Sequence, residues 1–263
     1  MIIKQIYSAN AFCNYYYFIV CSETNEALII DPIDAINCID ISKSNKYSIK
    51  QIVNTHEHGD HTAGNEKVKE LTGATLLAFT KLKKLLPHVD RWLSEGEIIN
   101  VGKSVKLKVL YTPGHTMAHV SLFSSDGIPS LFSGDALFNA GAGNCYNNGD
   151  PKRLYKTFTE CFAKLPGNTR VYPGHDYLIN NLRFTLDREP DNNKAKELLE
   201  KVKNQNPHNP FISTIDIEKE INTFFRLTSN SLIERLRDDF PKMPENPSTE
   251  DVFIMLRTLR NSW

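Results

Sequence analysis

The residues best suited to chemistry form one short motif, Thr-His-Glu-His-Gly-Asp-His, at positions 55–61. The segment before it, Ile49–Asn54, is rich in β-branched residues and predicts a strand. Because residues two apart in an extended segment point the same way, the side chains of His56 and His58 can close on one metal ion. So many polar side chains at a strand end are costly to bury, which makes a purely structural role unattractive.

The second half of the motif points to a second ion. Gly59 allows a tight turn after the first histidine pair. Asp60 and His61 then stand at the start of the next helix, displaced from that pair. The spacing therefore predicts two metal ions a short distance apart, and imidazole and carboxylate ligands suit zinc, iron and manganese.

Three more candidate ligands, His115, Asp135 and His175, stand where predicted strands end. Both histidines follow a Pro-Gly pair, which forces the chain to turn, and the aspartate follows Ser-Gly. Strand ends in layered α/β proteins converge on one edge, where sites usually lie. Together the five histidines and two aspartates give each ion three or four protein ligands and leave room for water.

The elements that must position these ligands alternate through the first two-thirds of the chain. Helices are predicted near residues 62–71 and 151–163, between short strands, and this alternation indicates an α/β architecture. The predicted strands are Ile2–Tyr7, Tyr15–Cys21, Ala27–Ile30, Ile49–Asn54, Val105–Tyr111, Val120–Phe123, Ser130–Phe132 and Thr169–Tyr172.

From Ile179 onward the pattern favours helices, punctuated by prolines, and no strand is expected. Ser248 with Asp251 three residues later is typical of a helix start. We expect a boundary near residue 174, with an α/β domain at 1–174 and a helical domain at 175–263. The predicted helices are Ile179–Arg188, Asn193–Gln205, Ile217–Thr223, Ser231–Asp238 and Ser248–Arg260.

The bulk composition bounds the partners and the compartment. Lys plus Arg and Asp plus Glu both number 31, so we expect neither nucleic acid nor a membrane as a partner. Five cysteines without a C-x-x-C pair argue against a disulfide framework and suggest a reducing compartment. The N-terminus lacks a signal-peptide layout, and the apolar run Tyr15–Val20 is far shorter than the about 20 residues that span a bilayer. A soluble, cytoplasmic, monomeric protein is the expectation.

The motif and its downstream partners resemble the metallo-β-lactamase superfamily, whose hallmark is T-H-x-H-x-D-H followed by separated His, Asp and His ligands. The resemblance covers residues 1–175 and implies a four-layer αββα fold, in which two packed β-sheets carry helices on both outer faces. It also implies a role for each ligand. The first ion would be held by His56, His58 and His115, the second by Asp60, His61 and His175, and Asp135 would bridge them.

Two further segments are similar to the glyoxalase II (hydroxyacylglutathione hydrolase) family. Ser133–Gly143 resembles its pattern around the bridging aspartate, and Gly174–Phe184 resembles its last ligand and the following helix. The predicted small all-helical C-terminal domain resembles that family's substrate-binding domain. The resemblance implies hydrolysis of the small-molecule thioester S-D-lactoylglutathione to D-lactate and glutathione, in methylglyoxal detoxification. It also implies two divalent metal ions, zinc first, with iron or manganese as alternatives.

The family's substrate contacts carry over to six positions. Two arginines three apart share a helix face, and guanidinium groups clamp carboxylates such as that of the glutathione glycine; two solvated surface arginines are the alternative. Position 144 holds Asn where the family commonly has Lys or Arg, and Arg260 stands where Lys is common, so a related thiol carrier stays open as the leaving group. The implied contacts are Asn144, Cys145, Tyr146, Tyr177, Arg257 and Arg260.

In the implied mechanism a water that bridges the two ions loses its proton, and the hydroxide attacks the thioester carbonyl. Asp60, which also orients this nucleophile, and Asp135 are the expected catalytic carboxylates. Asp31, directly before Pro32, is either a partner of a ligand histidine or a simple turn residue. The alternatives are an iron-dependent glutathione persulfide dioxygenase on the same fold, a nuclease, and a non-catalytic metal-binding module.

Overall fold

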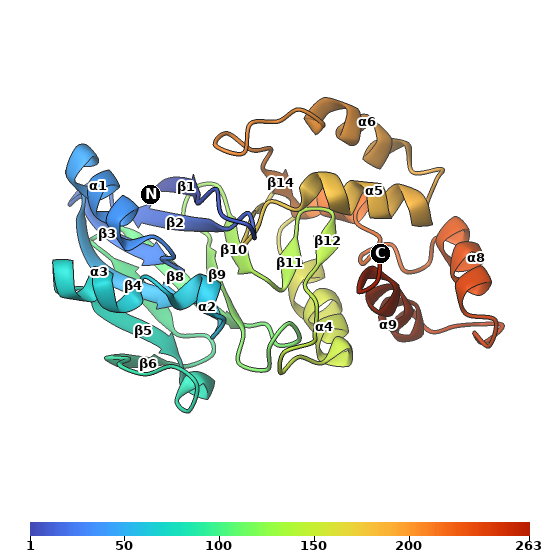
Figure 1. Cartoon of the computed structure of the whole chain (residues 1–263), viewed down its shortest axis with the longest axis horizontal. Helices are drawn as coiled ribbons and strands as arrows, with labels where there is room; N and C mark the ends of the chain where they lie inside the picture. The colour runs from blue at the N-terminus through green and yellow to red at the C-terminus, as the bar shows by residue number, and fades with distance from the viewer. The chain divides into compact units, whose positions relative to one another are not determined.

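The computed structural model describes all 263 residues, and the chain divides into two compact units. Unit 1 comprises Met1–Tyr111 and Ala118–Gly134, and unit 2 comprises Thr112–Met117 and Asp135–Trp263. Figure 1 labels the elements of both units. Each candidate ligand can therefore be placed within one unit.

The larger sheet of unit 1 has six strands in the order β1-β2-β3-β4-β5-β6. The first three run antiparallel and the others add in parallel. Strand β2 is buried along its whole length and β3 is buried and apolar after Glu26, as expected of a sheet covered on both faces. The strands are β1 Ile2–Tyr7, β2 Tyr15–Val20, β3 Glu26–Ile30, β4 Ser48–Asn54, β5 Thr75–Phe79 and β6 Arg91–Leu93.

Four antiparallel strands of unit 1 form a second layer: β7 Ile98–Val101, β8 Val105–Tyr111, β9 Val120–Ser124 and β10 Ser130–Gly134. The rings of Tyr17 on β2 and Phe132 on β10 lie 5.4 Å apart, edge to face, so the two sheets pack on each other. On the other face of the first sheet, Cys38 and Val68 from helices α1 (Ala35–Asn45) and α3 (Asn65–Thr72) join its core. Unit 1 is thus a helix-sheet-sheet stack.

Most of the predicted strands are confirmed, but helix α1 was not foreseen. Its sequence contains three isoleucines, which favour strands. The helix begins because the Asp34 side chain accepts a hydrogen bond from the Asn37 amide, and it ends at Lys46, which adopts a left-handed conformation. Local capping therefore outweighs residue propensity here.

Unit 2 carries two short antiparallel strand pairs, β11 Leu137–Phe138 with β12 Gly141–Ala142, and β13 Arg170–Pro173 with β14 Ser213–Thr214. The prediction of no strand after residue 179 is wrong for the two residues of β14. The helix predicted for 151–163 is α4 Pro151–Lys156, continued by a π-helical turn and a 3₁₀ turn.

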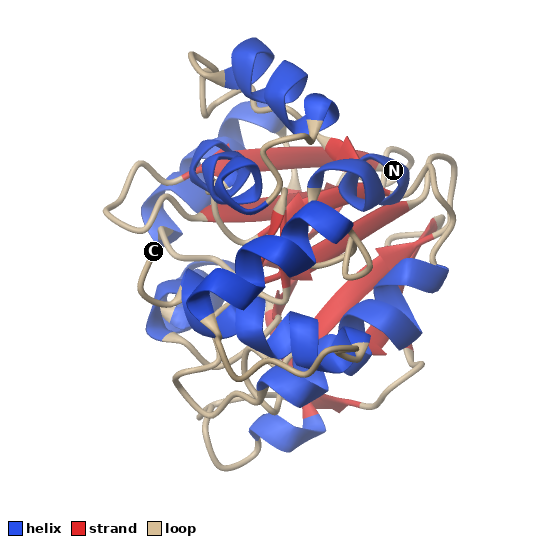
Figure 2. Cartoon of the chain, turned by 90° about the vertical axis from the view of Figure 1, so that its right-hand side faces the viewer, coloured by secondary structure: helices blue, strands red, loops and turns tan.

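The predicted C-terminal helices are confirmed, with ends shifted by a few residues. The Ser248–Asp251 signal is a full capping box at the start of the last helix. Helices are blue in Figure 2, and the C-terminal ones run from orange to red in Figure 1. None of the helices has both the length and the apolar character needed to cross a bilayer. They are α5 Leu178–Arg188, α6 Asn193–Val202, α7 Ile215–Ile221, α8 Asn230–Asp239 and α9 Thr249–Arg260.

Candidate active site

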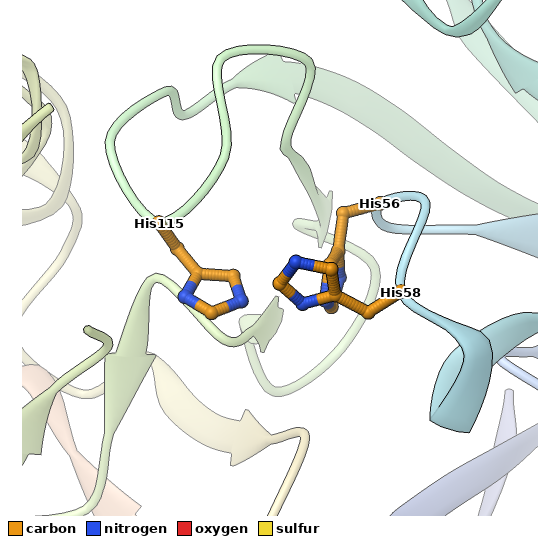
Figure 3. A group of neighbouring side chains, drawn as sticks. All are labelled: His56, His58 and His115. Atoms are coloured by element: carbon orange, nitrogen blue, oxygen red, sulfur yellow. The ribbon is translucent and has the colours of Figure 1, made fainter. Parts of the chain in front are cut away.

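Four predicted ligands, His56, His58, Asp60 and His61, gather in unit 1 and are called the motif cluster below. The first two leave the loop after β4, and Nε2 of His56 lies 3.1 Å from Nδ1 of His58. The other two stand in the short helix α2, Gly59–Thr62, with 3.6 Å between Nε2 of His61 and Oδ2 of Asp60. Figure 3 also draws His115, from the loop between β8 and β9.

Asp31 organises two histidines of the motif cluster. Its Oδ2 lies 3.0 Å from Nδ1 of His61, which leaves Nε2 of that ring to act as a ligand. Thr55 donates its hydroxyl proton to the same carboxylate over 2.6 Å. A hydroxyl has one hydrogen, so Nδ1 of His56 is the donor in its 2.9 Å contact with Thr55 Oγ1. Asp31 is therefore a partner of ligand histidines, in addition to lying at a turn with φ of 54°.

Asn14 contributes to the motif cluster, although no sequence pattern singles it out. Its Nδ2 donates to Oδ2 of Asp60 at 3.0 Å and to the Asp60 carbonyl at 3.2 Å. Asn54 likewise donates to the carbonyl of His61 at 2.9 Å. Both asparagines are buried, and isolated polar residues in β-rich segments carry no distinguishing pattern.

The other three predicted ligands, His115, Asp135 and His175, gather in unit 2 and are called the loop cluster. Oδ2 of Asp135 lies 3.0 Å from Nε2 of His175 and 3.6 Å from Nε2 of His115. The carbonyl of Asn144 is 2.7 Å from Nδ1 of His115, and because a carbonyl only accepts, that nitrogen carries the proton. The lone pair of His115 is thus on Nε2, on the side of Asp135.

Glycines differ in importance between the clusters. Gly114, directly before His115, has φ of 142°, and a Cβ there would stand 2.4 Å from the Leu154 backbone. Gly59 does not have a positive φ, and a Cβ on it would meet nothing within 4 Å. The turn expected at Gly59 therefore uses none of the extra conformational freedom of glycine.

The donor chemistry of both clusters fits divalent metal ions. The imidazoles are buried or half-buried, and the hydrogen bonds of three of them leave Nε2 as the coordinating atom. A buried carboxylate between two histidines, as at Asp135, is disfavoured without a cation nearby. Imidazole with carboxylate suits zinc, iron and manganese alike.

A pocket of about 230 Å³ in unit 2 collects five of the six predicted substrate contacts. Cys145 is not part of its lining; burial raises the pKa of the Cys145 thiol to about 11, which keeps it neutral and unreactive. No carboxylate lines the pocket, so its charge is positive. The lining comprises Phe138, Ala142, Asn144, Tyr146, Tyr177, Asn181, Arg257, Arg260 and Asn261.

Two aromatic residues of the lining connect this pocket to the loop cluster. The ring of Tyr177 stacks on that of His175 with centroids 4.9 Å apart, and Phe138 meets both rings edge-on. Tyr146 is 65% exposed, and its hydroxyl donates to the Asn261 carbonyl at the end of α9. The pocket therefore borders one of the candidate metal ligands.

The two arginines of α9 differ in their surroundings. Arg257 is only 4% exposed and donates to the carbonyls of Ala142 and Gly143 at 2.6 and 3.1 Å. Arg260 is half-buried, with its guanidinium near the Phe184 ring and Nη2 3.3 Å from Oδ1 of Asn181. Burial lowers the pKa of Arg257 to about 10 and also lowers that of Arg260, yet both stay cationic at neutral pH.

Comparison with known proteins first defines the class. Residues 11–175 match the family model of the metallo-beta-lactamase superfamily. The structure resembles the crystal structure of ETHE1 from Myxococcus xanthus, with a TM-score of 0.68, 23% identity and coverage of 100% of this chain and 99% of that one. A metallo-beta-lactamase from Staphylococcus aureus superposes with a TM-score of 0.66 and 26% identity, over 98% of this chain and 71% of that chain. The expected metallo-β-lactamase fold with a helical C-terminal domain is confirmed.

The sequence comparisons then give the family. Residues 176–263 match the model "Hydroxyacylglutathione hydrolase C-terminus". Proteins named hydroxyacylglutathione hydrolase from Nitrosococcus oceani and a Polaromonas species are 54% and 51% identical, over 100% of this chain and of each relative. A cytoplasmic hydroxyacylglutathione hydrolase from Arabidopsis thaliana is 34% identical over 85% of this chain and 88% of its own length. The chain belongs to the hydroxyacylglutathione hydrolase family.

Proposed function

We propose that this protein hydrolyses S-D-lactoylglutathione to D-lactate and glutathione, as the names of its relatives indicate. The observation that carries the proposal is the pocket that borders His175 through Tyr177 and Phe138. It combines aromatic walls, two cations and neutral amides, which together suit a peptide-like anion such as glutathione. A thioester carbonyl can then lie beside metal ligands.

The motif cluster and the loop cluster together would hold two divalent ions, zinc first, with iron or manganese as alternatives. His56, His58 and His115 would hold one ion, and Asp60, His61 and His175 the other, with Asp135 shared. Its carboxylate already faces one histidine of each set. When bound, such ions would lower the pKa of a bound water to about 7 and would polarise the carbonyl under attack.

The residues of the chain supply orientation. Asn14, by its hydrogen bond to Oδ2 of Asp60, fixes a carboxylate that can accept a proton from the attacking water. The aromatic rings of Tyr146 and Tyr177 and the guanidinium of Arg260 hold the glutathionyl group. Its thiolate, with a pKa of about 8.5, leaves without a general acid. Cys145 is proposed to shape the segment behind the pocket.

The decisive experiment joins a thioester assay with S-D-lactoylglutathione to elemental analysis of the purified protein. We expect D-lactate and free thiol in equal amounts and two metal equivalents per chain. Oxygen uptake with glutathione persulfide, without thioester hydrolysis, would instead favour a dioxygenase.

Three further points stay proposals. A domain boundary near residue 174 agrees with the junction between the two family models, whereas the compact units are arranged differently. A cytoplasmic location is supported by five cysteines that form no disulfide. The formal net charge of zero supports the absence of nucleic acid and membrane from the partners, and a monomer is proposed beside it.

A further inference from the structure

The segment Asn139–Asn144, which we call the strip, runs through the β11–β12 hairpin to the residue that holds His115. Side chains of the C-terminal helices make hydrogen bonds to successive backbone groups of the strip. Asn181 on α5 donates to the carbonyl of Asn139 at 3.0 Å, and Glu218 on α7 accepts from the amide of Ala140 at 2.9 Å. Asn222 at the end of α7 donates to the carbonyl of Gly141 at 3.1 Å.

Arg257 on α9 completes this series. Its Nη1 donates to the carbonyls of Ala142 and Gly143, and its Nη2 donates to Oδ1 of Asn261 at 3.0 Å. The guanidinium is nearly fully buried, and three of its N–H groups donate to oxygen atoms of the protein. Two of its five N–H groups remain, among them that of Nε, which is buried and has no hydrogen-bond partner within the protein.

The last residue of the strip, Asn144, contacts the proposed metal ligand His115. The next carbonyl after Gly143 is that of Asn144, 2.7 Å from Nδ1 of His115. A Cβ on Gly143 would stand 1.8 Å from the carbonyl oxygen of Asp135 and 3.1 Å from Nδ1 of His115. The strip therefore lies against both residues so closely that a small displacement of it must move them.

We propose that Arg257 is a positioning residue for the metal ligand His115, acting through the strip and the Asn144 carbonyl. The inference rests on the proposed role of His115 as a ligand. The acceptor on the far nitrogen of a ligand histidine fixes its tautomer and ring orientation, and loss of such a partner typically costs about 10–100-fold in metal affinity. The proposal is compatible with Asn at position 144, because the positioning is done by the backbone carbonyl and a residue of any type carries one.

Arg260 is the matched control. It lies three residues further along the same helix and lines the same pocket. Its hydrogen bond goes to the side chain of Asn181, which holds Asn139 at the end of the strip far from His115, and not to the strip backbone. Arg257→Met and Arg260→Met each remove one cation from the pocket. Only the first leaves buried carbonyls of the strip without their donor.

The test is chelator competition for Zn²⁺ on the full-length protein, with the visible spectrum of the Co²⁺-loaded protein as a second readout. Arg257→Met should weaken one of the two metal sites by about 10–100-fold and change the Co²⁺ spectrum. Arg260→Met should keep both affinities and the spectrum, while KM for the thioester rises. Wild-type metal affinity in Arg257→Met would overturn the proposal, whatever happens to KM.

Arg257→Lys guards against misfolding of the methionine variant. Its ammonium donates hydrogen bonds but lacks the fixed fork of a guanidinium, so a loss of metal affinity smaller than in Arg257→Met is expected. Unchanged affinity in both variants would overturn the proposal. Neither readout depends on turnover. Wild-type protein that hydrolyses no thioester would refute the proposed function and leave the positioning role of Arg257 to be decided by metal affinity alone.

Discussion

The motif cluster and the loop cluster position their histidines by different means. In the motif cluster one carboxylate, that of Asp31, holds His61 directly and His56 through Thr55. In the loop cluster His115 is held by a backbone carbonyl, and the segment that carries it is supported by helices as far along the chain as α9. The first arrangement depends on a side chain that one substitution can remove, whereas the second can be weakened only through its supports.

The comparison also explains which ligands are easy to find in a sequence. The candidate ligands of the motif cluster are close neighbours in the chain, at a strand end and the following turn. They therefore form a dense pattern that is visible in the sequence. The loop cluster is assembled by tertiary structure from three distant turns, so each of its members looks ordinary alone.

The largest expected effect comes from removing a ligand in either cluster. His58→Ala should lose one metal equivalent and lower kcat/KM by about a thousandfold or more, because metal polarisation contributes several kcal/mol to the transition state. His115→Ala should do the same, since the two histidines are assigned to one ion. Elemental analysis and the thioester assay measure both quantities.

The control for these variants is His88→Ala. His88 is exposed and pairs only with Glu66 at the surface, so metal content and turnover should stay at wild-type values. If His115→Ala kept full metal content while His58→Ala lost it, the two clusters would not share an ion, and the assignment of ligands would be wrong.

The next largest effect is expected for Asp31→Asn, which tests the side-chain mode of positioning. Asp31 accepts from the Thr55 amide, the Thr55 hydroxyl and the His61 ring, so one end of an Asn amide must face a donor with its own NH₂ group. Metal affinity should fall by about 10–100-fold and the free energy of unfolding by about 1–3 kcal/mol. Chelator competition and urea unfolding measure these changes.

Asp34→Asn is the matched substitution three residues away. Asp34 caps α1, and because Asn caps helices as well as Asp does, both measured quantities should change little. Equal losses in the two variants would mean that Asp31 acts only as a turn residue.

Much of this arrangement could be predicted from the sequence, and the remainder has physical reasons for being hidden. The dense motif at 55–61 and the turns at strand ends located all seven candidate ligands, and the pattern of apolar residues located most strands. The supports of the strip could not be found, because Asn181, Glu218, Asn222 and Arg257 act on backbone atoms of residues about 40 to 115 positions away. Every residue has a backbone carbonyl, so the residue type does not reveal which carbonyls act as acceptors.

A smaller effect should separate the glycines of the two clusters. Gly143→Ala places a methyl group against the carbonyl oxygen of Asp135, so the strip must shift, at a cost of about 1–3 kcal/mol in unfolding free energy. Gly59→Ala meets open space at the start of a helix and should be neutral or stabilising by up to about 1 kcal/mol. Urea unfolding compares them, and a Gly143→Ala variant as stable as Gly59→Ala would show that the strip can yield without cost.

The last prediction concerns pH and the deepest support of the strip. Glu218 is fully buried and accepts from Ser213, Asn222 and the Ala140 amide, and burial raises the pKa of its carboxyl. Its protonated form is therefore favoured in the folded protein. The stabilisation by protonated Glu218 is fully present below the pKa of the unfolded state, about 4.3. It is lost as the pH rises through the higher pKa of Glu218 in the folded protein.

Glu218→Gln stays neutral and removes this dependence. From about pH 4.5 upward, the unfolding free energy of the wild type should fall relative to that of the variant, by at most about 1.4 kcal/mol per pH unit. The exposed Glu234→Gln should track the wild type at every pH. Parallel curves for Glu218→Gln and wild type would mean that Glu218 keeps its ordinary pKa. In that case the strip would be held by an ionised carboxylate, and the loop cluster would depend on a buried charge just as the motif cluster depends on Asp31.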